Sequence, residues 1–239
     1  MFALYFQHLI TFTMNKYFFQ LIFFIGLSTV TIAQPTNVRE LPFFDKLKVT
    51  NQINVILSHG EELSARIEAK GIPLEDVITE VTGKTLEITL KRGVYTDIHV
   101  DVFVTYIELR DIYASASGRL SFQDTIKGDK LVANATTNGE INATVDLRTL
   151  DVSADKGGLV RLNGNLGSYE ARISTAGNLS ALELNADSAF VTVSSRAVAK
   201  VTAKELIDAH VRSGATLTLT GKPKEKKIKT GLGAKVLEQ

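Results

Sequence analysis

From Phe44 onward, apolar and polar residues alternate along most of the chain, with the two-residue period of β-strands. The alternation is clear over residues 53–57 and 98–104. A Thr-Gly-Lys turn at residues 82–84 separates two further alternating segments, which predicts a hairpin. We therefore expect an N-terminal antiparallel β region over residues 34–107.

Beyond Tyr106 the alternation becomes a repeat of about 19 residues. Each repeat contributes one residue to a predicted inward column: Ile112, Leu131, Leu150, Tyr169, Ala189 and Ile207. Small or apolar residues also recur two positions later and four positions later, and form two further inward columns. The column four positions later begins with Ala116 and Ala135. A small residue then marks each predicted corner: Gly118, Gly139, Gly158, Gly177, Ala197 and Gly214.

One such repeat cannot bury its own apolar face, whereas repeats stacked at ~4.8 Å form a continuous core. Residues 108–222 are therefore predicted to form a parallel β-helix, or β-solenoid, in an all-β protein. The alternative is an ordinary β-sandwich, in which turns recur every ~8–12 residues. The periodicity does not predict the handedness of the coil.

The first 33 residues differ sharply from the rest, because they hold nine of the eighteen aromatic residues and a single charged residue. The pattern of a signal peptide is present: Lys16 follows Met14, an apolar run covers residues 17–30, and the small residue Ala33 comes after it. The apolar run is shorter than the ~20 residues that a membrane-spanning helix needs. We expect Met14 to be the true start and the chain to be exported to the periplasm, the outer surface or the medium. A retained N-terminal anchor is the alternative.

We predict cleavage between Ala33 and Gln34, after the last small residue that precedes Pro35. Mass spectrometry of the exported protein should therefore find Gln34 at the N-terminus. A mature protein that retained residues 19–30 would contradict both the cleavage and the release from the membrane.

Charge and cysteine content exclude several classes of protein. Removal of residues 1–33 leaves 206 residues with 26 basic and 26 acidic side chains, which argues against nucleic acid as a partner. The absence of cysteine excludes disulfides, thiolate metal sites and a lipid anchor on cysteine. Residues 223–239 form a basic C-terminal edge, whose lysines are expected to discourage strand addition.

Catalytic and metal-binding patterns are missing from the sequence. No zinc-protease, hydrolase or phosphate-loop motif is present, and His59, His99 and His210 are scattered. We expect no cofactor, no metal and no catalytic residues.

The repeat itself points to one candidate surface, because residues between the inward columns should face outward. The candidate ligand contacts on this face are Tyr113, Asp151, Glu170, Arg172, Phe190 and His210. Asp151 and Glu170 should lie on neighbouring coils, as carboxylates do in polysaccharide lyases and hydrolases of this shape, so a carbohydrate-active enzyme is one alternative. Arg172 beside them favours a surface ion pair.

Several segments resemble a known bacterial family. Residues 44–57, residues 73–78 with the hairpin that follows, and the serial small-Gly corners are similar to the auto-transporter adhesin head GIN domain. The resemblance covers about residues 40–236. It implies a right-handed solenoid of the pectin-lyase-like kind, residence at the cell envelope of Bacteroidetes-type bacteria, and an adhesion role without a catalytic set.

Three functions are thus open. The first is a non-enzymatic solenoid that binds an unknown protein or glycan at the cell envelope. The second is the carbohydrate-active enzyme, and the third is a purely structural envelope subunit that stacks end to end, with a homo-oligomer as one form.

Overall fold

The computed structural model describes residues 36–239, so the predicted signal peptide, residues 1–33, lies outside the described residues. Among residues 36–239, no helix is long and apolar enough to cross a membrane. One short 3-10 turn, η1 (Leu74–Asp76), accompanies the strands.

Eighteen strands make up the rest of the secondary structure of residues 36–239. Those of the N-terminal half are β1 (Thr36–Glu40), β2 (Lys46–Val49), β3 (Asn54–His59), β4 (Ser64–Lys70), β5 (Val77–Thr82), β6 (Thr85–Leu90), β7 (His99–Tyr106), β8 (Asp111–Ala114) and β9 (Arg119–Phe122). Those of the C-terminal half are β10 (Ile126–Thr136), β11 (Glu140–Asp155), β12 (Leu159–Ile173), β13 (Asn178–Val193), β14 (Val198–Thr202), β15 (Leu206–Val211), β16 (Thr216–Thr220), β17 (Glu225–Thr230) and β18 (Lys235–Glu238).

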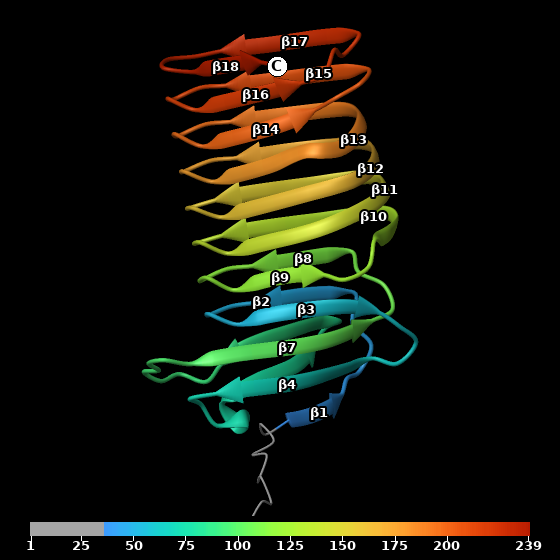
Figure 1. Ribbon diagram of the computed structural model, residues 1–239, viewed down its shortest axis with the longest axis vertical. Helices are drawn as coiled ribbons and strands as arrows, with labels where there is room; N and C mark the ends of the chain where they lie inside the picture. The colour runs from blue at the N-terminus through green and yellow to red at the C-terminus, as the bar shows by residue number, and fades with distance from the viewer. Residues whose placement is uncertain (1–35) are drawn as a thin grey trace, which may run out of the picture. The chain divides into compact units, whose positions relative to one another are not determined.

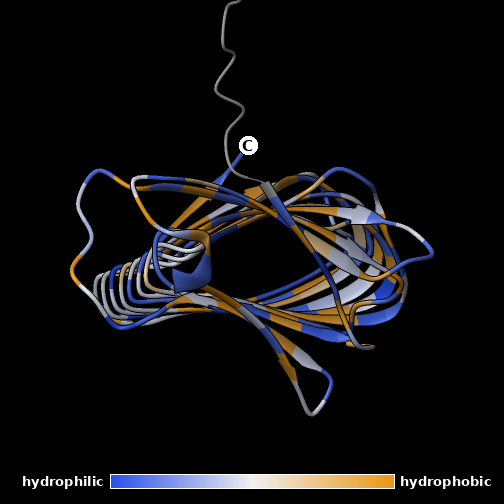
Figure 2. Ribbon diagram, turned by 90° about the horizontal axis from the view of Figure 1, so that it is seen from below, coloured by the Kyte–Doolittle hydropathy of each residue, from blue (hydrophilic) through white to orange (hydrophobic). Residues whose placement is uncertain are grey.

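The strands form a β-solenoid, as the repeat predicts (Figure 1). One sheet stacks β2, β8, β15, β17 and the C-terminal halves of β10–β13, all in parallel. The facing sheet stacks β3, β9, β14, β16, β18 and the N-terminal halves of β11–β13. Seen along the stack, the coils superimpose as a flattened ring with the corner turns stacked at one edge (Figure 2).

The inward columns form the core between the two sheets. All six residues from Ile112 to Ile207 in the predicted first column are buried, and so are their neighbours two positions on. Small side chains fill the narrow interior, and Tyr169 is the largest of the fully buried residues. Burial raises the pKa of the Tyr169 phenol well above its usual range.

The first coil corrects the predicted alignment. Ile112 pairs with Ala133, two residues beyond the predicted Leu131. Leu120 pairs with Ile141, 21 residues on, whereas Ile126 pairs with Val145, 19 residues on. The two extra residues therefore lie between β9 and β10, in the turn 123–125. As a result Ala116, predicted to face inward, is exposed in a corner with a φ of 49°.

A second correction concerns the upper corner. Val198 pairs with Thr216, so the residue that corresponds to Ala197 is Ala215 and not the predicted Gly214. Gly214 instead occupies the preceding corner position, where φ is +73°. Left-handed backbone is favourable there for glycine.

The N-terminal region is antiparallel only in part. β1, β4 and β7 pair antiparallel, and β5 and β6 form the predicted hairpin. β2 and β3, in contrast, pair in parallel with β8 and β9 and add a coil to the solenoid. At the other end, β17 and β18 stack in parallel on β15 and β16, so the basic C-terminal residues form a further coil.

A short hydrogen-bonded ladder links two corners. The Ser174 hydroxyl donates to an Asp155 carboxylate oxygen at 2.7 Å, one coil below. This bond is the largest cause that holds the pKa of Asp155 below its usual 3.8, with further hydrogen bonds from Thr175 and the Lys156 backbone. The charged carboxylate therefore stabilises the stack of corners.

This ladder predicts a pH dependence of stability. A carboxylate whose folded pKa is lowered stabilises the fold above its unfolded pKa, and that contribution is lost as the pH falls through the folded pKa. We expect the wild type to lose more thermal stability than Asp155→Asn when the pH falls from about 5 to about 2. Melting temperatures across this range test the prediction, and parallel curves for the two proteins would contradict it.

Candidate outer strip and cavity

The six predicted contact residues lie on the outer face of the sheet that contains β8, β10–β13 and β15. We call this set the outer strip: Tyr113, Asp151, Glu170, Arg172, Phe190 and His210. Each side chain is at least partly exposed, and Phe190 is 43% exposed. Parallel pairing brings Asp151, Glu170 and Phe190 onto successive strands.

The placement of Tyr113 corrects the predicted columns. Tyr113 pairs with Asn134 and so belongs to the column of Arg172 and His210, whereas the sequence predicted it in the column of Asp151. The cause is the same two-residue slip as in the first coil. Ser115, predicted to face outward, is buried at the corner.

Ion pairs neutralise the carboxylates of the outer strip. Lys130 Nζ lies 2.7 Å from Asp151 Oδ2. Arg172 pairs with Glu170, as the sequence indicates. His210 Nε2 lies 3.6 Å from Oδ1 of Asp208, the residue that pairs with Phe190 on the adjacent strand. The strip therefore offers alternating charged pairs around one exposed aromatic ring, a surface suited to contacts along several coils.

No metal centre is found among residues 36–239: no group of three or more His, Asp and Glu side chains is arranged to hold an ion. His99 Nε2 lies 3.0 Å from Asp101 Oδ2 on β7. His59 packs edge-on against Tyr106, with ring centroids 5.8 Å apart. Both histidines thus have local structural contacts.

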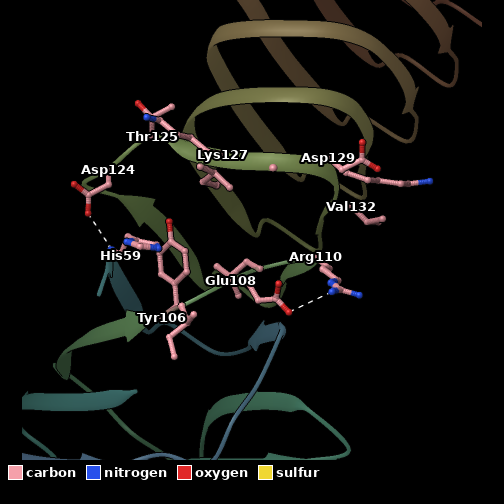
Figure 3. A pocket seen from close by; sticks show the side chains of 14 residues that line it. His59, Tyr106, Glu108, Arg110, Asp124, Thr125, Lys127, Asp129 and Val132 are labelled. Carbon is pink, nitrogen blue, oxygen red and sulfur yellow. Dashed lines mark hydrogen bonds and ion pairs between the residues drawn. The ribbon is translucent and has the colours of Figure 1, made fainter. Parts of the chain in front are cut away.

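A cavity of about 1060 Å³ opens beside the first coils (Figure 3). Its lining includes His59 and Tyr106 at the ends of β3 and β7, Glu108 and Arg110 before β8, and Asp124 and Lys127 around the start of β10. The His59 backbone N–H donates to Asp124 Oδ2 at 3.0 Å. Burial is the larger cause, and the negative charge of Asp124 the smaller one, that raises the pKa of Tyr106 to about 12. The phenol of Tyr106 therefore stays protonated at neutral pH.

The repeat does not predict this cavity, because its lining residues come from three distant segments of the chain. One signal was available. The predicted corners Gly118 and Gly139 are 21 residues apart, two more than the repeat, and a polar run begins at Gln123. An enlarged coil with a polar insertion indicates a local irregularity in a solenoid.

Three solved structures with a similar fold come from Bacteroides and Parabacteroides species. A structure described as a putative adhesin from Bacteroides fragilis has a TM-score of 0.78 at 17% identity, covering 87% of this chain and 98% of its own. A putative lipid binding protein from Parabacteroides distasonis has a TM-score of 0.68 at 18% identity, covering 87% and 98%. A putative adhesin from Parabacteroides merdae has a TM-score of 0.64 at 17% identity, covering 87% and 97%. At such identities the similarity extends to the fold alone.

No curated protein sequence matches the chain. A family model described as "Putative auto-transporter adhesin, head GIN domain" matches residues 43–223. The matched segment runs from just before β2 to just after β16, and so includes the coils that carry the outer strip. The chain therefore belongs to the auto-transporter adhesin head GIN domain family.

Proposed function

We propose that this protein is an exported, non-enzymatic binding protein of the bacterial cell envelope, and that it acts as an adhesin through its outer strip. The family and the adhesin descriptions of its structural neighbours support this class of function. The signal-peptide pattern of residues 14–33 supports export.

The observation that carries the proposal is the parallel register of the outer strip. Glu170, Phe190 and Asp208 lie on three successive strands, with Arg172 in the adjacent column. Parallel strands stack at ~4.8 Å, so a polymer running along the stack meets an equivalent position on every coil. A protein segment or glycan of extended shape fits this arrangement. Long-range steering is weak because the predicted mature chain has no net charge.

The enzyme alternative depends on Asp151 and Glu170, and the geometry favours it less. Glycoside hydrolysis requires two carboxyl groups about 5 to 9.5 Å apart across a sugar-binding cleft, one of them protonated at working pH. Asp151 and Glu170 instead pair with Lys130 and Arg172 on an open sheet face.

The double change Asp151→Ala and Glu170→Ala tests the two functions against each other. We expect the variant to keep its melting temperature within a few degrees, because exposed ion pairs contribute about 0–1 kcal/mol each. Ligand binding should change only modestly, by about two- to fivefold, because Arg172 and Phe190 remain. Binding is measured on a glycan array, with polysaccharide lyase and hydrolase assays alongside. Loss of a bond-cleaving activity in the variant would establish the enzyme and overturn the proposal.

A further inference from the structure

The coils have a third surface, where strands pass from one sheet to the other. We call it the side wall: residues 126–130, 145–149, 164–168 and 184–188 of β10–β13. These stretches pair in parallel, each with the next. Above them, Lys204 N–H donates to the Ala186 carbonyl and Lys224 N–H donates to the Lys204 carbonyl. Inside the wall, each stretch thus has a neighbour on both sides.

The lowest stretch of the side wall, residues 126–130, is paired on one side only. Pairing between β10 and β8 begins at Val132, whose N–H donates to the Arg110 carbonyl at 2.9 Å. Within residues 36–239, no backbone hydrogen bond joins residues 126–130 to residues 107–109. The start of β10 is therefore an open strand edge in the middle of the stack.

The chain topology explains why the edge is open. A regular solenoid would continue from β3 directly into β8, but β4–β7 are inserted between them. β7 pairs with β3 on the side opposite to β9, so residues 107–110 must cross the level of β3 to reach β8. A segment that climbs in this way cannot run parallel to residues 126–130.

The cavity occupies the space between this open edge and the climbing segment (Figure 3). Its volume of about 1060 Å³ lies beside both segments, and the ring of Tyr106 faces it from below. Residues 127–130 are all exposed. Gly128 has no side chain to screen the backbone, and it lies at the centre of the edge.

Charges at the edge indicate the chemistry of an occupant. Arg110 pairs with Glu108 at 3.3 Å, and Lys130 pairs with Asp151 at 2.7 Å. Lys127 is exposed, and no carboxylate of the described chain lies within ion-pair distance of its Nζ. An incoming acidic side chain can pair with it.

We infer that residues 126–130 bind an extended peptide segment of a partner protein by strand addition, with an acidic side chain of that segment beside Lys127. An open strand edge is a template for a further strand, whose main-chain hydrogen bonds provide affinity while its side chains provide specificity. Glu108 and Arg110 form the far side of the cavity. A single extended chain fits between these residues and the open edge, whereas a second folded solenoid would collide with them. This site adjoins the outer strip, because Lys130 at its end pairs with Asp151. It uses the backbone edge of residues 126–130 rather than the side chains of the strip, so it does not depend on the proposed function.

The test uses the exported chain and a synthetic seven-residue peptide of alternating Val and Thr with one central Glu. A matched peptide carries N-methyl groups on alternate residues, which removes backbone donors without changing any side chain. Fluorescence anisotropy measures binding of both peptides, and hydrogen exchange measures protection of the amides of residues 126–130. We expect the unmethylated peptide to bind with a Kd below about 1 mM and the methylated one at least about tenfold more weakly.

Two variants with the same charge change locate the site. Lys127→Glu should weaken binding of the Glu peptide at least about threefold and restore it for a peptide with Lys in place of Glu. Lys204→Glu, on the segment above the side wall whose backbone is hydrogen-bonded on both sides, should leave binding unchanged. The inference would be overturned if the methylated and unmethylated peptides bound equally, or if no binding were seen at about 1 mM. It would also be overturned by protection of amides outside residues 126–130, by equal effects of the two variants, or by dimerisation of the protein through this edge.

Discussion

Replacement of Val152 by Asp is expected to unfold the solenoid at temperatures far below those of the wild type. Val152 is 2% exposed and lies between Ala133 on the coil below and Ala171 on the coil above. The new carboxylate would have no partner among these methyl groups. An unpaired buried charge costs several kcal/mol of unfolding free energy. Denaturant unfolding followed by circular dichroism measures the loss.

The matched control is Ser153→Asp, one residue further along the same strand. Ser153 faces outward beside Arg172, and its hydroxyl donates to Asn134 Oδ1 at 2.6 Å. A carboxylate there remains hydrated next to the guanidinium, so we expect a change of about 0.5 kcal/mol or less. Equal damage from the two substitutions would mean that the inward and outward faces are exchanged, by a shift of one residue.

The second large effect is expected at a corner, from Gly158→Ala. A Cβ at Gly158 would lie 2.1 Å from the Ala135 carbonyl oxygen on the coil below, a separation that backbone atoms cannot accept without moving. Because forced overpacking typically costs 1–3 kcal/mol, we expect a loss of about that size. Differential scanning calorimetry of residues 34–239 measures it.

Lys156→Ala is the control for this corner. Lys156 is exposed and already adopts a φ of 49° with a side chain present, so alanine introduces neither a clash nor new strain. We expect its effect to stay within about 0.5 kcal/mol. If Gly158→Ala were as harmless as Lys156→Ala, the coils would be further apart at the corner than the structure has them.

The inward columns between residues 131 and 211 were predictable because the pleat forces every second residue into a narrow interior. The first coil was not, because Leu131 and Ala133 are both apolar and both face inward. A slip of two residues keeps the strand side chains on their faces and changes only those at the corner, so alternation along the strands cannot detect it. Only pairing with β8 distinguishes the two alignments.

The partners of β2 and β3 could not be predicted for a related reason. Short alternating strands have the same pattern whether their neighbours run parallel or antiparallel. The choice depends on the insertion of β4–β7, which places β2 and β3 against β8 and β9. The cavity follows from the same insertion, so it too was beyond a reading of local pattern.

The outer strip was largely predictable, since five of its residues follow directly from the repeat. Asp151, Glu170 and Phe190 take the predicted column, and Arg172 and His210 the adjacent one. Tyr113 moved between columns because it lies in the first coil. Ligand binding depends on side-chain chemistry, which the repeat does not encode.

Binding by residues 34–239, compared with binding by two matched double variants, therefore tests the central claim most directly. The variant with Arg172→Ala and Phe190→Ala loses a cation and an exposed apolar side chain from the outer strip. The control with Lys200→Ala and Leu182→Ala loses a cation and an exposed apolar side chain from the opposite sheet. On an array of glycans and envelope proteins, we predict that the wild type and the opposite-sheet variant bind the same ligand and do not cleave it. The outer-strip variant should bind at least about tenfold more weakly, a loss of ~1.4 kcal/mol. Equal binding by the two variants, or cleavage of the ligand by the wild type, would contradict the account.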